Sequence, residues 1–369
     1  MQKGAVSLFV VIFTALLITT ITISFMQLMV RDQRQATFSD LSESAYDSAT
    51  AGVEDAKRLL LMQQDCIGND SQNCSAIRAA VSLGECTTLS SIFGGSDSGE
   101  ASIVQTEGDR KLEQAYTCVK ISQDTDDYLG TIDADTTATL IPLSGKQPFD
   151  TVVISWALSK SAGDITVPNS TTGTLPVKGA STWPESYPAL LRTQLINSGE
   201  SFALSELDGD KSKALFLYPT TTGLSTFDFA LSGRRSASAA PQLVRCNAHT
   251  PSGDYACRAA LSLGSTIQAG STTTFLNLVA FYNATDYKVE LKSGGLNGTV
   301  VQFDNVQPEV DSTGRANDLF RRVVSRVQLN NSFNYPVAAL EARNSICKDF
   351  SITTDPNDYV PSQQCTPTN

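Results

Sequence analysis

The most prominent pattern in the chain is an apolar run at residues 5–30 that contains no charged side chain. As an α-helix this run spans about 39 Å, which is enough to cross a lipid bilayer. A cleaved secretory signal has a shorter apolar core, of about 7–15 residues, and ends in a small-residue cleavage site. This run is longer and no clear site of that kind follows it. The pattern therefore predicts an uncleaved membrane helix.

The helical pattern continues through residues 31–64 in a different form. Small and apolar side chains recur at every third or fourth position, at Phe38, Leu41, Ala45, Ala49, Val53, Ala56 and Leu60. This spacing predicts an amphipathic helix continuous with the first, because the chain has no proline before Pro142. Gly52 interrupts the pattern at a cost of about 1 kcal/mol relative to Ala. We expect one helix of about 60 residues, roughly 90 Å long, whose second half packs on its own globular domain.

The rest of the chain has the pattern of strands and turns, with one short helix at 75–83. The candidate strands are 115–121, 137–141, 151–157, 214–218, 227–231, 242–246, 274–282, 287–291, 299–303, 323–329 and 337–342. We predict an α+β fold in which a long N-terminal helix packs on a large antiparallel β-rich head. The polar stretch 160–186 is a surface loop or a boundary, and we place a division of the head there, into 65–160 and 161–369.

Charge narrows the possible partners. The formal net charge is −11 and the sequence pI is about 4.6, whereas binding nucleic acid needs a basic face. The densest basic patch contains Arg315, Arg321, Arg322 and Arg326. Docking on an acidic partner is one interpretation of this patch. We favour the other, the solvated face of a strand or helix, and expect no binding to nucleic acid.

The cysteines indicate an oxidising compartment. They fall into neighbouring pairs, which we predict to be disulfides: Cys66 with Cys74, Cys86 with Cys118, Cys246 with Cys257, and Cys347 with Cys365. Eight cysteines allow 105 connectivities, so the pairing is a hypothesis. Zinc is the alternative, but the chain has no CxxC and a single histidine. Disulfides place the large domain outside the cytoplasm, which the basic residues flanking the apolar run do not decide.

Motifs for catalysis are absent from the sequence. It has no P-loop, no dinucleotide-binding glycine motif after a strand and no HExxH motif. The single histidine, His249, lies in a turn-like loop between two cysteines, and a catalytic triad through it would be the basis of an anchored hydrolase. We expect no enzymatic activity, no catalytic residue and no cofactor.

Calcium is the alternative ligand. Acidic clusters occur at 208–212 and at Asp124, Asp126, Asp127, Asp133 and Asp135. Oxygen-rich loops bind calcium, but neither cluster has the glycine and closing glutamate of an EF-hand in the required places. We interpret both clusters as solvated loops and assign no metal site, leaving calcium as the open alternative.

The start of the chain, Met1-Gln2-Lys3-Gly4 followed by Ala5 and the apolar run, resembles a type IV prepilin. Residues 45–57 (AYDSATAGVEDAK) are similar to the alanine-rich stretch of PilX-type minor pilins. In that family a prepilin peptidase removes a short basic leader after its glycine, and the new first residue is methylated. The resemblance implies a leader at 1–4, with Gly4 and Ala5 as the processing site. It covers about the first 60 residues.

One departure from the family is informative. Most pilins carry a glutamate at the fifth mature position, where it is thought to pair with the terminal amine of the preceding subunit; here that position is Phe9. Phe9 cannot make this pair. The family's helix-kinking proline is also missing. These departures resemble minor pilins and pseudopilins that occupy or initiate a filament tip.

The resemblance implies a minor-pilin-like structural subunit of a type IV pilus, acting in filament assembly or initiation and in surface adhesion. Small side chains at Ala15, Thr19, Thr22 and Ser24 permit close approach of neighbouring helices. The implied partners are other pilin subunits, pilus assembly membrane proteins and prepilin peptidase. The implied location is the cytoplasmic membrane, spanned once with the head outside, and a cell-surface pilus after assembly.

Two alternatives stay open on the same residues. One is a single-pass, membrane-anchored extracellular binding domain that does not polymerise and retains residues 1–4. The other is a pseudopilin of a secretion system, which is processed but stays in the envelope.

Overall fold

The computed structural model describes residues 3–68, 71–82, 84–86, 89, 92, 101–102, 114–134, 138–160, 163–168, 183–197, 212–229 and 241–328. The chain forms two compact units. Unit 1 consists of Met1–Ser122 and Glu309–Val327, and unit 2 of Gln123–Pro308 and Gln328–Asn369. The first part of unit 2, Gln123–Pro308, is therefore inserted between the two parts of unit 1, and the chain enters unit 2 again after Val327.

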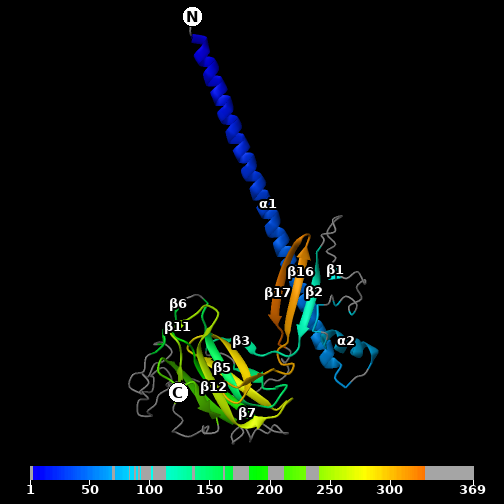
Figure 1. Ribbon diagram of the computed structural model, residues 1–369, viewed down its shortest axis with the longest axis vertical. Helices are drawn as coiled ribbons and strands as arrows, with labels where there is room; N and C mark the ends of the chain where they lie inside the picture. Colours follow the sequence, from blue (N-terminus) through cyan, green and yellow to red (C-terminus); the bar gives the residue numbers. More distant parts are fainter. Residues whose placement is uncertain are drawn as a thin grey trace, which may run out of the picture. The chain divides into compact units, whose positions relative to one another are not determined.

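Unit 1 is a long helix lying on an antiparallel sheet (Figure 1). Its elements are α1 (Lys3–Asp65), α2 (Gln72–Ser82), β1 (Ala101–Ser102), β2 (Gln114–Ser122), β16 (Glu309–Ala316) and β17 (Leu319–Arg326). The strand order is β1-β2-β16-β17, with every neighbouring pair antiparallel. The two central strands, β2 and β16, come from opposite sides of the insertion, so the sheet closes only when both parts of the chain are present.

The second half of α1 buries the stripe that the sequence predicts. Ala45, Ala49, Ala56 and Leu60 are fully buried, Val53 is 7% exposed, and Leu41 is half-buried. Phe38 is the exception, at 65% exposed. It lies one turn before Ser42, whose hydroxyl oxygen accepts a 2.7 Å hydrogen bond from Arg321 of β17. The amphipathic prediction is thus confirmed from Leu41 onward.

Two glycines bring the backbones of helix and sheet close together. A Cβ on Gly314 of β16 would overlap the backbone of α1 at Ala45 and Ala49. A Cβ on Gly52 of α1 would overlap the hydroxyl of Ser312 in β16. Gly52, which the sequence pattern treats as an interruption, therefore serves the packing of the helix on the sheet.

Unit 2 is a β-sandwich. Its strands are β3 (Tyr128–Ile132), β4 (Thr139–Pro142), β5 (Phe149–Leu158), β6 (Gly163–Asp164), β7 (Leu190–Asn197), β8 (Ser212–Thr220), β9 (Thr226–Asp228), β10 (Gln242–Arg245), β11 (His249–Thr250), β12 (Tyr255–Ile267), β13 (Thr274–Phe281), β14 (Thr285–Ser293) and β15 (Thr299–Val301). One sheet has the order β15-β14-β5-β12-β9, with β3 also paired to β14. The other has the order β10-β8-β7-β13-β4, and β6 pairs with β11. The pairs β8–β10 and β9–β12 are parallel, and the other pairs are antiparallel.

The core of unit 2 lies between its two sheets. Alternate residues of β5, including Val152, Ile154 and Trp156, and alternate residues of β13, including Leu276 and Leu278, belong to one buried cluster. A period of two places these side chains on one face of each strand, so the two sheets pack face to face. The indole N–H of Trp156 donates a 3.0 Å hydrogen bond to the carbonyl of Ala189, which satisfies its one polar atom.

The α+β fold, with a long N-terminal helix and a large β-rich region, is confirmed. The predicted strands 115–121, 151–157, 214–218, 242–246, 274–282 and 287–291 coincide with β2, β5, β8, β10, β13 and β14. The predicted strand 337–342 lies outside the described residues. No strand was predicted at β7, β12 or β16, whose polar positions break the apolar alternation.

The division of the head lies elsewhere than the sequence indicates. The chain changes unit after Ser122, after Pro308 and after Val327, whereas we expected a division near residue 160. The polar stretch after residue 160 includes β6, which pairs with β11 inside unit 2. A polar surface segment within one domain and a boundary between two have the same composition, so composition does not distinguish them.

Candidate functional site

The first half of α1 has no packing partner within the chain. Its large apolar side chains from Val10 to Val30 are between 47% and 73% exposed. It is one helix that is long and apolar enough to cross a membrane, and its most apolar window is 0% buried. Because such a surface is unfavourable in water, this segment needs lipid or other helices around it.

The hydroxyl groups in this segment are satisfied by the helix itself. Thr14, Thr20 and Ser24 donate to carbonyl oxygens three or four residues earlier, at 2.9–3.1 Å. Thr19 and Thr22 do the same. A polar atom without a partner is costly in hydrocarbon. These bonds therefore make the run compatible with a membrane despite its five hydroxyl side chains in the range 14–24.

The predicted small-residue surface is narrower than expected. At 3.6 residues per turn, Ala15, Thr19 and Thr22 lie within about 60° of one another on one face of the helix. Ser24 lies on the opposite face, about 180° from Ala15. The helix therefore groups three of the four predicted residues, and Ser24 does not belong to the group.

The predicted processing residues lie at the start of α1. Gly4, Ala5 and Phe9 are all helical, within the element that begins at Lys3. The whole helix, from Lys3 to Asp65, is 63 residues long without a break. Nothing in this geometry tests processing, which stays a prediction.

Three of the four predicted disulfides are present in the described residues: Cys66–Cys74, Cys86–Cys118 and Cys246–Cys257. The first joins the end of α1 to α2, the second ties residue 86 to β2, and the third links β10 to β12 in unit 2. Cys347 and Cys365 lie outside the described residues. Disulfides form and persist in oxidising compartments.

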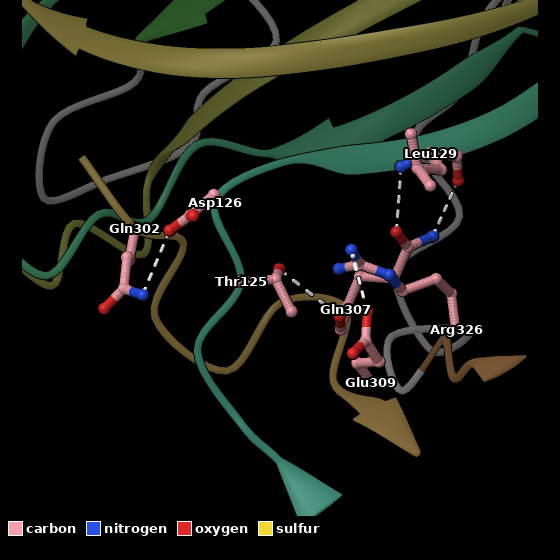
Figure 2. A network of polar contacts seen from close by, with 7 residues as sticks. All are labelled: Thr125, Asp126, Leu129, Gln302, Gln307, Glu309 and Arg326. Atoms are coloured by element: carbon pink, nitrogen blue, oxygen red, sulfur yellow. Dashed lines mark hydrogen bonds and ion pairs between the residues drawn. The ribbon is translucent and has the colours of Figure 1, made fainter. Parts of the chain in front are cut away.

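The insertion is closed at its two ends by side chains of unit 2. The side chain of Gln307, which is 4% exposed, hydrogen-bonds to the backbone of β3 as a neighbouring strand would (Figure 2). Its side-chain oxygen accepts a 2.9 Å hydrogen bond from the N–H of Leu129, and its side-chain nitrogen donates to the Leu129 carbonyl at 2.8 Å. Gln302 donates to Asp126 at 3.0 Å. The two ends of the inserted stretch 123–308 are thus fastened to each other.

The same pair of segments begins from neighbouring strands in unit 1. Ser122, the last residue of β2, is paired with Glu309, the first residue of β16. In unit 1 an ion pair of 3.1 Å joins Glu309 to Arg326 of β17 (Figure 2). An insertion whose two ends leave from paired residues leaves the host sheet unbroken, which is how an additional domain is tolerated in a fold.

The arginines of the predicted basic patch lie on two paired strands, β16 and β17, and two of them have acidic partners. Arg322 on β17 donates to Asp311 on β16 at 2.7 Å, and Arg326 pairs with Glu309 as described. Asp311 raises the pKa of the exposed Arg322 guanidinium, which keeps it charged. Arg315 lies on β16, and Arg321 reaches Ser42. Arg321 and Arg322 are neighbours in β17 and therefore point to opposite faces of the sheet, so the four arginines do not form one solvated face. Arg322 and Arg326 are neutralised within the unit.

The acidic cluster after β2 contains a lysine. Lys146 lies 3.1 Å from Asp124 and 3.3 Å from Asp304, and these carboxylates raise its pKa. Within the described residues, no group of three metal-ligating side chains was found. Asp135 and the cluster 208–211 lie outside those residues.

His249 is exposed at the start of β11. Its backbone N–H donates to the side-chain oxygen of Asn247 at 3.2 Å, and it pairs in register with Asp164 of β6. Of the six N-x-S/T sequons, those at Asn73, Asn283 and Asn297 lie in the described residues.

Sequence reasoning missed the contact that fastens β2 to α1. The Tyr116 hydroxyl of β2 donates a 2.8 Å hydrogen bond to the Asp55 carboxylate of α1. Burial, followed by this hydrogen bond, raises the pKa of Tyr116 well above its usual value of 10.0. An acidic residue on the polar face of a helix gives no signal of a specific partner 61 residues away. The pair can be found only once the sheet is known.

Comparisons with protein-family models, with curated proteins and with solved structures found no match.

Proposed function

We propose that this protein is a minor-pilin-like subunit of a type IV filament, in which unit 1 assembles and unit 2 is displayed. The observation that carries the proposal is the division of α1. Its first half is apolar all round and 0% buried within its most apolar window, and its second half lies on an antiparallel sheet through small residues. A helix with one half suited to lipid and one half fixed to a sheet fits a subunit that first lies in a membrane and then joins the helical core of a filament.

The N-terminal sequence supports the same proposal. Gly4 followed by Ala5 and an unbroken apolar helix is the arrangement that a prepilin peptidase processes in the family that the chain resembles. The surface of Ala15, Thr19 and Thr22 gives neighbouring helices a place to approach closely when they replace lipid. Phe9 in place of a glutamate favours a place at the tip or in initiation over the bulk of a filament.

The inserted sandwich supports a display role. Assembly as proposed uses α1 and the four-stranded sheet, and unit 2 interrupts neither, because it leaves and returns at paired residues Ser122 and Glu309. A domain added in this way is free to recognise a surface or partner. The disulfides are consistent with export of both units, with the head outside the cytoplasmic membrane.

The proposal is tested by fractionating native cells into sheared surface material, membranes and soluble contents. A filament subunit is expected in the sheared fraction without residues 1–4. A Gly4→Arg variant is expected to keep its leader and to stay in the membrane fraction, with Lys3→Arg as the matched control that is still processed and sheared.

The two alternatives give different results in the same experiment. A protein found only in membranes and still carrying residues 1–4 would be a non-polymerising anchor for the sandwich. A processed protein that never enters the sheared fraction would be a pseudopilin of a secretion system. Either result would contradict the filament proposal.

A further inference from the structure

Unit 2 has a hollow of about 520 Å³ beside the Cys246–Cys257 disulfide. Its walls come from the turn after β8, from β10 and the residues that follow it, and from β12. This volume lies within the range of about 300–1,000 Å³ that is usual for small-ligand sites. The hollow is separate from every residue that the assembly proposal uses.

Two arginines are held at this hollow by the disulfide. Arg245 comes directly before Cys246, and Arg258 directly after Cys257. Both cysteines are buried, at 4% and 0% exposed, and successive side chains in a strand point to opposite faces. The cross-link that points into the core therefore directs both arginines outward, where both are exposed and line the hollow.

The backbone around the two arginines is fixed by hydrogen bonds. The N–H of Arg245 donates to Leu224, and the N–H of Cys246 donates to Thr220, each at 2.8 Å. The N–H of Asn247 donates to Ala256, also at 2.8 Å. A site whose charged side chains stand on a cross-linked and hydrogen-bonded base loses little entropy when a ligand binds.

The charge of the hollow is opposite to that of the chain. Its described lining includes Arg245 and Arg258 and no acidic side chain, in a protein with a formal net charge of −11. Arg258 also touches Glu290 outside this lining, at 3.4 Å, which orients its guanidinium. Arg245 has no ion pair among the described residues. Arginine is the side chain best suited to hold a carboxylate, because its N–H groups match both oxygens.

The remaining lining suits a sugar. Ser225 and Asn247 offer hydroxyl and amide groups for hydrogen bonds, and Leu296 offers an apolar contact for a ring. A polyanion such as nucleic acid would meet the negative field of the whole chain, whereas a single carboxylate would not. We propose that this hollow binds an acidic sugar residue through its carboxylate. The inference deepens the proposed function, since it names what the displayed domain recognises.

The test uses the full chain purified in detergent, with N-acetylneuraminate and glucuronate as probes and glucose as the uncharged control. Binding is measured by saturation-transfer NMR and titration calorimetry. We expect binding of one or both sugar acids and none of glucose. Arg245→Gln and Arg258→Gln are each expected to weaken binding by about tenfold. Lys213→Gln, which removes the same charge from β8 away from the hollow, is expected to bind as the wild type does.

Several outcomes would overturn the proposal. These are the absence of binding to either acid, equal binding of glucose, unchanged affinity in both arginine variants, or competition by inorganic sulfate at the same concentration as the sugar acid. Tryptophan fluorescence checks that each variant is folded, because both tryptophans lie in unit 2. The arginine variants should still be processed and reach the sheared fraction, so a failure of binding and a failure of assembly are distinguishable.

Discussion

The two halves of α1 obey different packing rules although they are one continuous helix. In the first half, large side chains such as Leu16, Ile18 and Phe25 are 60–69% exposed. In the second half the buried positions are mostly small, and Ala45 and Ala49 are fully enclosed. Large exposed side chains suit lipid or exchangeable neighbours, whereas small buried ones fix a single partner at a short distance.

The difference shows where the specificity of the unit lies. The second half meets the backbone of β16 at Gly314, which leaves no freedom to slide or rotate. The first half has no such contact within the described residues, and any helix with a similar apolar surface can replace the membrane around it. A subunit that transfers from membrane to filament needs both properties.

The largest effect is expected from filling the contact between helix and sheet. Gly314→Val would place a branched side chain against the backbone of α1 at Ala45 and Ala49, and we expect it to destabilise unit 1 by more than about 4 kcal/mol. The measurement is urea unfolding followed by circular dichroism at helix wavelengths. Tryptophan fluorescence, which reports unit 2, should change little.

Thr313→Val on the opposite face of the same strand is the matched control for Gly314→Val. It is expected to change stability by less than about 0.5 kcal/mol, as surface substitutions usually do. Equal stability of the Gly314 variant and this control would contradict the close packing of α1 on β16.

The next largest effect is expected in the exposed half. Ile18→Lys places a charge near the middle of the apolar run, at a cost of about 2.5–3.5 kcal/mol for insertion into a membrane. We expect the variant to appear in the soluble fraction, with the unfolding of unit 2 unchanged. Ile18→Leu should stay in membranes, and full retention of the lysine variant would show that the first half of α1 does not span.

Replacing one alanine by leucine in each half of α1 tests whether the two halves differ in packing. Ala49→Leu overfills the contact with the sheet and should cost about 1–3 kcal/mol of the stability of unit 1. Ala15→Leu should cost none, because Ala15 is exposed and the first half of α1 has no packing partner within the described chain. The Ala15 variant should instead reach the sheared filament fraction less often. Equal losses of stability in the two variants would remove the distinction between the halves.

The smallest effect concerns the bond between Tyr116 and Asp55. Tyr116→Phe removes a hydrogen bond to a carboxylate and should cost about 1.5 kcal/mol. The folded pKa of Tyr116 is raised above the unfolded value of about 10, so its contribution is complete below pH 10 and is lost as pH rises through the folded pKa. The wild-type unit 1 should therefore lose more stability above pH 10 than the phenylalanine variant does. Identical alkaline profiles would contradict this.

Sequence patterns predicted the local features of this protein well. The length of α1, the buried stripe from Leu41 to Leu60 and three cysteine pairs all follow from spacing along the chain. Each depends on residues that are close in sequence, where helical periodicity or a short loop decides the outcome. The surface of Ala15, Thr19 and Thr22 follows from helical geometry in the same way. Ser24 was wrongly added to it, because its distance along the chain does not show that it lies on the opposite side of the helix.

The features that were missed depend on residues distant in sequence. Pairing of Ser122 with Glu309 makes unit 2 an insertion, and no composition shift marks that pairing. Gly52 looked like a weakness in a helix because its partner Ser312 lies 260 residues away. The two arginines beside Cys246 and Cys257 are brought together by the disulfide and by the antiparallel bridge between these cysteines. Such sites become visible only with the topology of the sheets.

The most direct test of the central claim is the mass of the mature N-terminus in protein purified from native membranes. The account predicts a first peptide that begins at Ala5 and is heavier than its sequence by one methyl group. A first peptide that begins at Met1 or Gln2 would contradict it, and would leave α1 as a permanent anchor for a displayed domain.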